Sequence, residues 1–344
     1  MKKILRIACG LLLSSLVIGA CGCEKGGNSE NGGDNNATAA VTSNPTEEPT
    51  PEITEIPVPT RDPADTRKTA NIVLLIGQSN AVGVAHNQYL EKKIPSKDYR
   101  RAKTGYNNVK ILYWAEAGGA EGEKNTYLTN MKTIPEEGDM TIGNVFKNVK
   151  LGQAWRSFIF GPEVGIAKYL SDNHADEEFY IVKVAKGSVA IGDSWLEGQY
   201  CYEKMVSFMD VAVKTLEKEN LRPELAAVCF MQGENEATEE KAAEEYYESL
   251  SDLVKRIRTK YNDISAPGGI RFIDAGIMEM RPFAKKINET KAKFADESNL
   301  NYYFSTVEMG LHTDQEPEGN VDIDHYDAES MWQLGQKFGE YICD

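Results

Sequence analysis

From residue 69 onward, short apolar runs alternate with segments in which apolar residues recur every three or four positions. The runs, bounded by glycine or polar residues, predict buried strands, and the periodic segments predict amphipathic helices. The predicted strands are residues 71–76, 109–113, 179–185, 225–231 and 270–277, with 301–306 as a sixth or edge strand. The predicted helices start near Pro162 or span residues 202–219, 238–261 and 327–342.

Strands that alternate with helices predict an α/β fold with a mostly parallel sheet covered on both faces. In such sheets a ligand lies beyond the carboxyl ends of the strands. Three turns that combine glycine with polar residues follow predicted strands, namely Gly77-Gln78-Ser79, Lys186-Gly187-Ser188 and Gln232-Gly233-Glu234-Asn235. One such turn is usually only a strand terminator, but three at the same sheet edge indicate an active site.

The first twenty residues predict an export signal. Lys2, Lys3 and Arg6 precede an apolar stretch over residues 7–20, which is too short to span a membrane. The end of this stretch, Val17-Ile18-Gly19-Ala20-Cys21, resembles a bacterial lipobox. That resemblance implies a signal peptide over 1–20, cleavage before Cys21 and a lipid on its thiol. An ordinary signal peptide with a coincidental cysteine is the alternative.

Residues 21–68 are rich in Thr, Pro, Glu, Gly and Asn and contain few core-forming side chains. Such a segment cannot bury enough apolar surface to offset its ordering entropy, so we expect a disordered linker between the anchor and a folded domain. The expected location is the extracellular face of a bacterial cell membrane, with the protein held there by lipid.

Charge and cysteine content exclude several functions. The formal net charge of −15 argues against a nucleic-acid partner, which requires a basic surface. The folded region holds Cys201, Cys229 and Cys343, an odd number that is not a disulfide framework. No spacing resembles a zinc site, so we expect neither a metal nor a cofactor.

The turn motifs, together with Gly161-Pro162-Glu163 and Asp322-x-x-His325, occur in an order that resembles the SGNH (GDSL-like) hydrolases. Within them the similarity is to the sialate O-acetylesterase branch, which includes acetylxylan esterases. The resemblance covers the folded region, 69–344. It implies a flavodoxin-like three-layer α/β/α sandwich with a mostly parallel five-stranded sheet, no metal, and hydrolysis of acetyl esters on carbohydrate.

The residues themselves supply a catalytic triad. Ser79 is the expected nucleophile and His325 the base that accepts its proton. Asp322 precedes the histidine by three residues, so on a helical turn both would share a face and the carboxylate would orient the imidazole. Ser79 as a helix N-cap is one alternative, and Asp324 as the orienting acid is another. A cation-binding loop formed by Asp322, Asp324 and Asp327 is a third.

Oxyanion donors are expected from the same turns. The Ser79 N–H lies at a helix start, and Gly187 can bring a second N–H close because it lacks a side chain. Asn235 offers a side-chain amide, and the resemblance leaves Gln232 open in its place. The chain departs from the family in two positions: Ser188 replaces the second of two glycines, and Glu236 replaces an aspartate.

Substrate contacts are expected from Gln78, Glu234 and Trp195, since indole faces stack well on sugar rings. Trp114 and Trp155 are further candidates for stacking, with burial in the core as the alternative for all three tryptophans. Two other functions remain open: an SGNH esterase or lipase acting on another acyl ester, and a non-catalytic glycan-binding lipoprotein.

Overall fold

A computed structural model of the chain describes residues 63–118, 127–131 and 133–343. The expected signal peptide over 1–20, the lipid attachment at Cys21 and most of the expected linker lie outside the described residues. The last residues of the expected linker lie within the described part. Arg222 donates from its backbone N–H to the carbonyl of Lys68, and from its guanidinium to the carbonyl of Asp65. Residues 65–68 are therefore tied to the folded domain.

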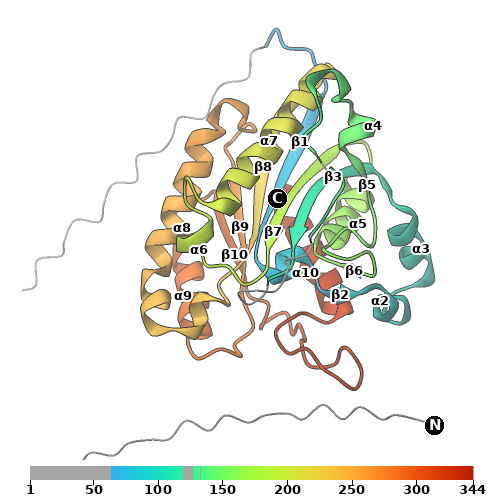
Figure 1. The fold of residues 1–344 in the computed structure, drawn as a ribbon. Helices are drawn as coiled ribbons and strands as arrows, with labels where there is room; N and C mark the ends of the chain where they lie inside the picture. Colours follow the sequence, from blue (N-terminus) through green and yellow to red (C-terminus); the bar gives the residue numbers. More distant parts are fainter. Residues whose placement is uncertain (1–62, 119–126, 132, 344) are drawn as a thin grey trace, which may run out of the picture. The chain divides into compact units, whose positions relative to one another are not determined.

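A twisted sheet forms the centre of the domain (Figure 1). Its path is β10-β9-β8-β1-β7-β3-β4, and β5 also pairs with β3. The strands are β1 (Thr69–Gly77), β3 (Tyr106–Glu116), β4 (Tyr127–Thr129), β5 (Lys147–Val149), β7 (Phe179–Lys186), β8 (Arg222–Met231), β9 (Arg271–Ala275) and β10 (Asn301–Phe304). Among the described residues the sheet thus has eight strands where five were expected.

The parallel part of the sheet is the expected one. Pairing is parallel for β1 with β7 and β8, for β8 with β9, for β9 with β10 and for β3 with β7. When the strands β1, β7, β8, β9 and β10 are numbered 1 to 5 along the chain, their order in the sheet is 2-1-3-4-5, which is the flavodoxin-like order. The strand β3 is added at the edge beyond β7. The short strands β4 and β5 pair antiparallel with β3 and account for the remaining difference.

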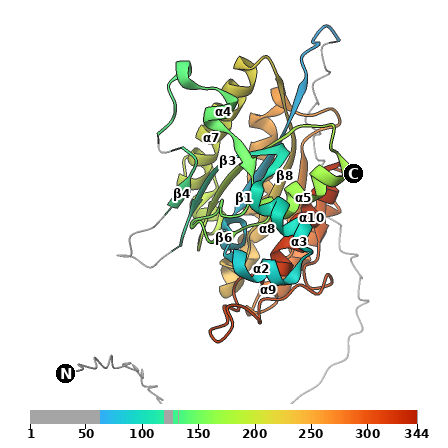
Figure 2. The same cartoon turned by 90° about the vertical axis from the view of Figure 1, so that its right-hand side faces the viewer.

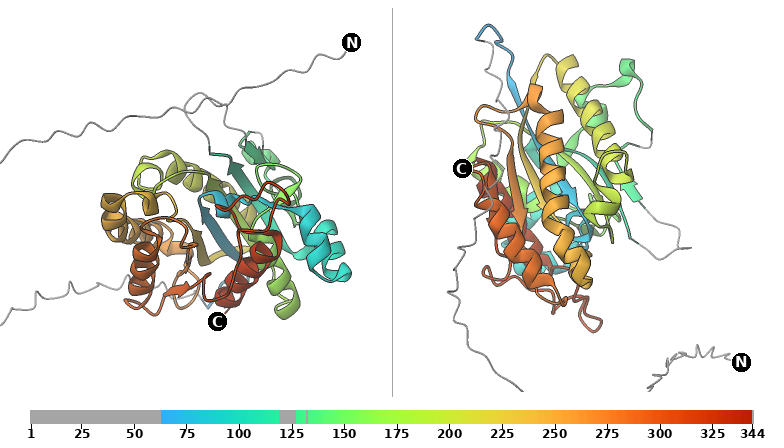
Figure 3. Two further views of the ribbon diagram at one scale, coloured as in Figure 1. Left: turned by 90° about the horizontal axis from the view of Figure 1, so that it is seen from below. Right: turned by 90° about the vertical axis from the view of Figure 1, so that its left-hand side faces the viewer.

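Helices cover both faces, which gives three layers (Figures 2 and 3). One face carries α5 (Glu163–Asn173) and α10 (Ala328–Cys343), and the other carries α7 (Tyr200–Lys218) and α8 (Glu240–Lys260). Next to α8 and β10 lies α9 (Ala284–Ala295). The shorter elements are α1 (Ser79–Val82), β2 (Ala85–His86), α2 (Asn87–Lys93), α3 (Ser96–Thr104), η1 (Glu137–Asp139), α4 (Ile142–Val145), β6 (Ile159–Phe160), α6 (Ile191–Ser194), η2 (Glu236–Thr238) and η3 (Asn262–Ile264).

Burial explains the elements. Residues 72–76 of β1 are fully buried because the strand has a parallel neighbour on each side and helices on both faces. The sequence pattern missed α9, since its buried face includes Asn288 and Lys291 and so does not read as apolar. No helix among the described residues is long and apolar enough to cross a membrane.

Candidate active site

The three polar-glycine turns meet at one edge of the sheet, as expected from the strand pattern. Gly77, the last residue of β1, is in register with Ala185 of β7 and Met231 of β8. A Cβ on Gly77 would lie 2.0 Å from the carbonyl oxygen of Met231, and φ is +143°. Only glycine fits there, and its positive φ lets the chain leave β1 and enter the turn that carries Ser79.

Ser79 is the first residue of α1 and is partly exposed just beyond the end of β1. The N–H of Gln78, the residue before it, donates to the carbonyl of Met231 over 2.9 Å. The turn is therefore fixed to the neighbouring strand β8, at the point where the order of the parallel strands reverses, and this is where open α/β sheets bind ligands.

His325 and Asp322 form a hydrogen-bonded pair. The imidazole Nδ1 lies 2.7 Å from Asp322 Oδ2, and the His325 N–H donates to the Asp322 carbonyl over 3.3 Å. The expectation of a helical turn was wrong, because the two residues lie in a loop before α10. The hydrogen bond from His325 holds the pKa of Asp322 below its usual value, which keeps the carboxylate charged.

Asp324, the alternative orienting acid, faces elsewhere. Its carboxylate forms an ion pair with Arg281, while its N–H donates to Asp322 Oδ1 over 3.2 Å. The acid in contact with the imidazole is Asp322. The alternative of a cation-binding loop also finds no support, since the described residues contain no cluster of three or more His, Cys, Asp or Glu side chains able to hold a metal ion.

Asn80 connects the serine turn with the histidine loop. Its Nδ2 donates to the carbonyl of Asp324 over 3.3 Å, and its Oδ1 accepts the N–H of Tyr326 over 3.2 Å. These two partners are the residues before and after His325. The side chain next to Ser79 therefore holds the backbone on both sides of His325, and Nδ2 also donates to Glu234 Oε1 over 2.7 Å.

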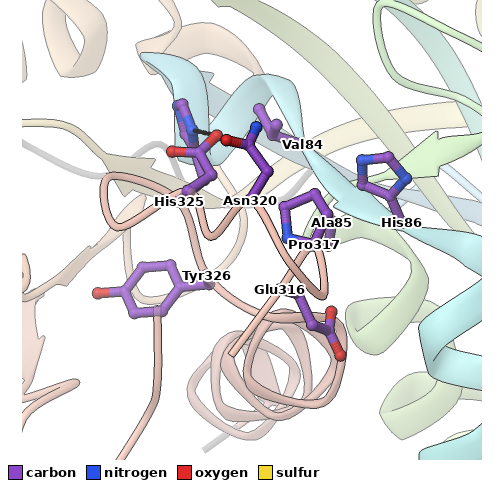
Figure 4. Close-up of a pocket in the computed structure, with 9 residues that line it drawn as sticks. Val84, Ala85, His86, Glu316, Pro317, Asn320, His325 and Tyr326 are labelled. Carbon is purple, nitrogen blue, oxygen red and sulfur yellow. Dashed lines mark hydrogen bonds and ion pairs between the residues drawn. The ribbon is translucent and has the colours of Figure 1, made fainter. Parts of the chain in front are cut away.

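A pocket opens beside the imidazole (Figure 4). His325, Asp322 and Asn320 line it together with Pro317, Ala85 and His86. Figure 4 shows His86 across this pocket from His325. Burial lowers the pKa of His86, so its imidazole is neutral near pH 7. Neither His86 nor Asn320 was predicted from the sequence to be part of a site.

Two expected oxyanion donors are engaged elsewhere. The N–H of Gly187 donates to the carbonyl of Glu116 over 3.0 Å, and a Cβ on Gly187 would lie 2.5 Å from the nitrogen of Gly118. Gly187 is glycine because another backbone passes close to it. Fully buried Gln232 donates from its amide to Glu236 and to the carbonyl of Val189. Both residues were wrongly expected to donate to an oxyanion.

Ser188 and Asn235 remain at the sheet edge with exposed side chains. Ser188 has a φ of +56°, in the left-handed region, which explains why a glycine suits this position. No described residue forms a hydrogen bond with its N–H. This N–H takes the place of Gly187 as a candidate donor, while Asn235 keeps its candidacy as an exposed amide.

The family model for "carbohydrate esterase, sialic acid-specific acetylesterase" matches residues 69–344 of the chain. The chain belongs to this family. It is a carboxylic ester hydrolase, and the SGNH-type resemblance of its motifs is confirmed.

Several solved structures are similar to this esterase, and two of them, with TM-scores above 0.5, share its fold. A protein from Arabidopsis thaliana is 17% identical with a TM-score of 0.53, and covers 80% of this chain and 98% of its own. NanS is 14% identical with a TM-score of 0.51, over 80% of this chain and 97% of its own. A carbohydrate acetylesterase from Xanthomonas citri is 14% identical with a TM-score of 0.45, over 78% and 55%. A search of curated proteins finds no match.

Burial separates the expected substrate contacts of the esterase. Trp195 is fully buried and Trp114 is 4% exposed, so neither ring face is available to a sugar, and Trp195 was wrongly expected to contact substrate. Gln78 is also buried, at 4% exposed, whereas Glu234 is partly exposed and bonded to Asn80. Trp155 is the one of the three candidate tryptophans that stays partly exposed.

Two acids of the family motifs have structural roles in the esterase. Glu163 is fully buried, and it accepts from Lys183 Nζ over 2.7 Å and from the Gly161 N–H over 3.0 Å. Glu236, one of the two expected departures from the family pattern, accepts from the N–H of Ile191 over 2.7 Å as well as from Gln232. Together with Gln232, it fastens the segment after Gly187 to the end of β8.

Proposed function

We propose that the chain is an extracellular serine esterase that removes O-acetyl groups from carbohydrate through an acyl-enzyme on Ser79. The observation that carries the proposal is the Asp322–His325 pair, held beside the Ser79 turn by the two hydrogen bonds of Asn80. Membership of a carbohydrate esterase family supports the reaction class, and the description of that family as sialic acid-specific acetylesterases supports acetyl as the acyl group.

In the proposed reaction His325 accepts the hydroxyl proton of Ser79 as the oxygen attacks the ester carbonyl. Asp322, already bonded to Nδ1, stabilises the imidazolium that forms. The imidazolium then protonates the leaving sugar oxygen, which releases the deacetylated sugar. Water, activated by the same histidine, attacks the acetyl-serine and releases acetate.

Negative charge develops on the carbonyl oxygen in both steps. The proposed donors are the N–H groups of Ser79 and Ser188 and the side-chain amide of Asn235, which come from the ends of β1, β7 and β8. Loss of one such donor typically reduces the rate by about 10²–10³.

The location belongs to the same proposal. The charged start, short apolar stretch and Cys21 support export and a lipid anchor, with residues 22–64 as tether once the tied residues 65–68 are left out of the expected linker. An enzyme at this place would meet glycans outside the cell. Incorporation of labelled palmitate into the full chain, compared with Cys21→Ala, tests this part separately from catalysis.

The function is tested by acetate release from a panel of acetylated glycans, with 4-nitrophenyl acetate as a small ester. We expect Ser79→Ala to lower kcat by at least about 10⁴ and Asp322→Asn by about 10²–10⁴, with unchanged circular dichroism. A fluorophosphonate should label Ser79 and no other serine. Turnover by Ser79→Ala above a few per cent of wild type contradicts the nucleophile assignment.

The same panel separates the two alternative functions. Release of longer acyl chains but not of acetate from glycans would indicate an esterase for another ester. Glycan binding without release of any acid would indicate a binding lipoprotein.

A further inference from the structure

An aromatic and cationic surface adjoins the pocket beside His325. We call it the 155–158 ridge: Trp155, Arg156 and Phe158, in the loop before β6. Phe158 is 50% exposed, and its ring centroid lies 5.6 Å from that of His86, which lines the pocket. A large exposed aromatic ring in direct contact with a pocket residue is a surface on which a sugar ring can stack.

The ridge is held rigidly beside the pocket. β6 pairs antiparallel with β2, which places Ile159 opposite His86. Asn87 extends this pairing, because its N–H donates to the carbonyl of Phe158 over 3.0 Å and its side-chain amide to that of Ser157 over 3.1 Å. The pocket wall and the ridge thus belong to one small hydrogen-bonded unit.

Arg156 places a positive charge on this ridge. Its guanidinium carbon lies 4.2 Å from the ring centroid of Trp155 and 5.8 Å from that of Phe158. No carboxylate of the described residues forms an ion pair with it, although the chain has a net charge of −15. The stacking on Trp155 orders the side chain without satisfying the charge, so the guanidinium is free to take an anionic ligand.

The position of this charge indicates which sugar carries the anion. Phe158 contacts both Arg156 and His86, and of these three only His86 lines the pocket, so the guanidinium lies outside the pocket on the far side of that contact. An acetylated sugar bound at His325 would leave Arg156 opposite the next sugar along the chain.

We propose that the 155–158 ridge is a subsite for a carboxylate-bearing sugar, such as a uronic acid, next to the acetylated residue. Its ring stacks on Phe158 and its carboxylate binds Arg156. The inference rests on the proposed function, since it concerns the glycan that the same site deacetylates.

The test compares two acetylated oligosaccharides of equal length, one with a uronic acid beside the acetylated sugar and one fully neutral. Wild type should prefer the acidic one in kcat/KM, and Arg156→Gln should reduce that preference about five- to twentyfold through KM. Added salt should reduce it in wild type and leave Arg156→Gln unchanged. Phe158→Ala should raise KM for both oligosaccharides, with Phe158→Tyr close to wild type.

Lys293→Gln is the matched control. Lys293 stacks on Tyr247 in the last turn of α9, just before the start of β10 and so at the sheet edge opposite the active site, and its loss should not change the preference. Hydrolysis of 4-nitrophenyl acetate should stay within about twofold of wild type for Arg156→Gln, because this ester does not reach the ridge.

Each contrary result points to a different failure. The subsite is overturned if wild type and Arg156→Gln release acetate with the same ratio of kcat/KM for the acidic and the neutral oligosaccharide. The proposed esterase function would then still stand. The subsite is also overturned if Arg156→Gln changes kcat/KM only for a free acetylated sugar that carries its own carboxylate. In that case the anion would lie on the acetylated residue and not on its neighbour. No release from either oligosaccharide by wild type overturns the proposed function and the subsite with it.

Discussion

Asn80 is the residue on which the geometry of the site depends most directly. It is 2% exposed, and its amide bonds both neighbours of His325 and the carboxylate of Glu234. The other carboxylate oxygen of Glu234, Oε2, is buried without a partner among the described residues. Glu234 therefore orients the Asn80 amide, and Asn80 in turn positions the imidazole relative to Ser79.

Replacement of Asn80 should affect turnover more than binding. We expect Asn80→Ala to lower kcat by about 10²-fold, because a displacement of about 1 Å between base and nucleophile has an effect of this size, with KM within about threefold. The measurement is kcat and KM on 4-nitrophenyl acetate and on the glycan that the panel identifies.

Two further variants distinguish positioning of the imidazole from a general loss of stability. Asn80→Asp should not restore activity, since a second carboxylate would face Glu234 across 2.7 Å. Glu234→Gln keeps an oxygen that accepts from Asn80 and should stay within about tenfold of wild type. A positioning role would be contradicted if all three variants lost kcat to the same extent and also had the same decrease in melting temperature.

At the level of elements, the turn between β7 and α6 is shaped by three separate contacts. Glu116 holds the N–H of Gly187, Gln232 holds the carbonyl of Val189, and Glu236 holds the N–H of Ile191. Burial raises the pKa of Glu236, while the hydrogen bonds that it accepts from the Ile191 N–H and from Gln232 favour its charged form. The segment that presents the Ser188 N–H is therefore fixed from β3 on one side and from β8 on the other.

Ser188 gives the prediction at this scale. A non-glycine residue at φ +56° costs about 1–2 kcal/mol, so Ser188→Gly should leave activity intact and raise the free energy of unfolding by up to about 1 kcal/mol. Ser188→Val should lower both the activity and the free energy of unfolding, because a β-branched side chain is least tolerated at a positive φ. Urea unfolding and kcat provide the measurements, and a lower stability of Ser188→Gly would contradict this account of the turn.

At the scale of the whole molecule, two buried ion pairs lie within the apolar layers of the described residues. Lys183 bonds Glu163 between β7 and α5, and Lys291 bonds Asp274 between α9 and β9 with Nζ 2.6 Å from Oδ1. All four side chains are at most 2% exposed. Each pair links a helix to the sheet, and loss of one partner would leave the other charge buried and uncompensated.

Asp274 makes the stability of the molecule depend on pH. Burial raises its pKa to about 6 from an ordinary 3.8, although the Lys291 ammonium opposes the shift. Between pH 4 and 6 the folded protein holds a proton that the unfolded chain has released. The contribution of this group to the free energy of unfolding is therefore complete below about pH 4 and is lost as the pH rises through 6.

Asp274→Asn should remove that contribution. The variant should be less stable overall, but its free energy of unfolding should rise more steeply with pH between 4 and 6 than that of wild type, by up to about 1.4 kcal/mol per pH unit. Denaturant unfolding at intervals of half a pH unit provides the measurement, with the exposed Asp324→Asn as control. Parallel curves for wild type and Asp274→Asn would show that Asp274 has an ordinary pKa in the folded state.

Most of the parallel sheet was predictable from sequence, and α9 shows where prediction stopped. The core strands are continuous apolar runs because both of their faces are buried, and this leaves a clear local signal. In α9, by contrast, Asn288 pairs with the backbone of Ile277, and Lys291 pairs with Asp274. Partners distant in sequence make polar side chains acceptable in the core, and no local pattern records them.

Sequence motifs identified the family and brought Ser79, Asp322 and His325 forward as candidates, because glycine turns and residue types with catalytic chemistry are local features. The choice between Asp322 and Asp324, the engagement of Gly187 and Gln232, and the burial of Trp195 were decided only by the folded chain. So was the placement of His86 at the pocket and of Arg156 on the adjoining 155–158 ridge. The direction and solvent access of a side chain depend on contacts between segments far apart in sequence, and these contacts exist only in the tertiary structure.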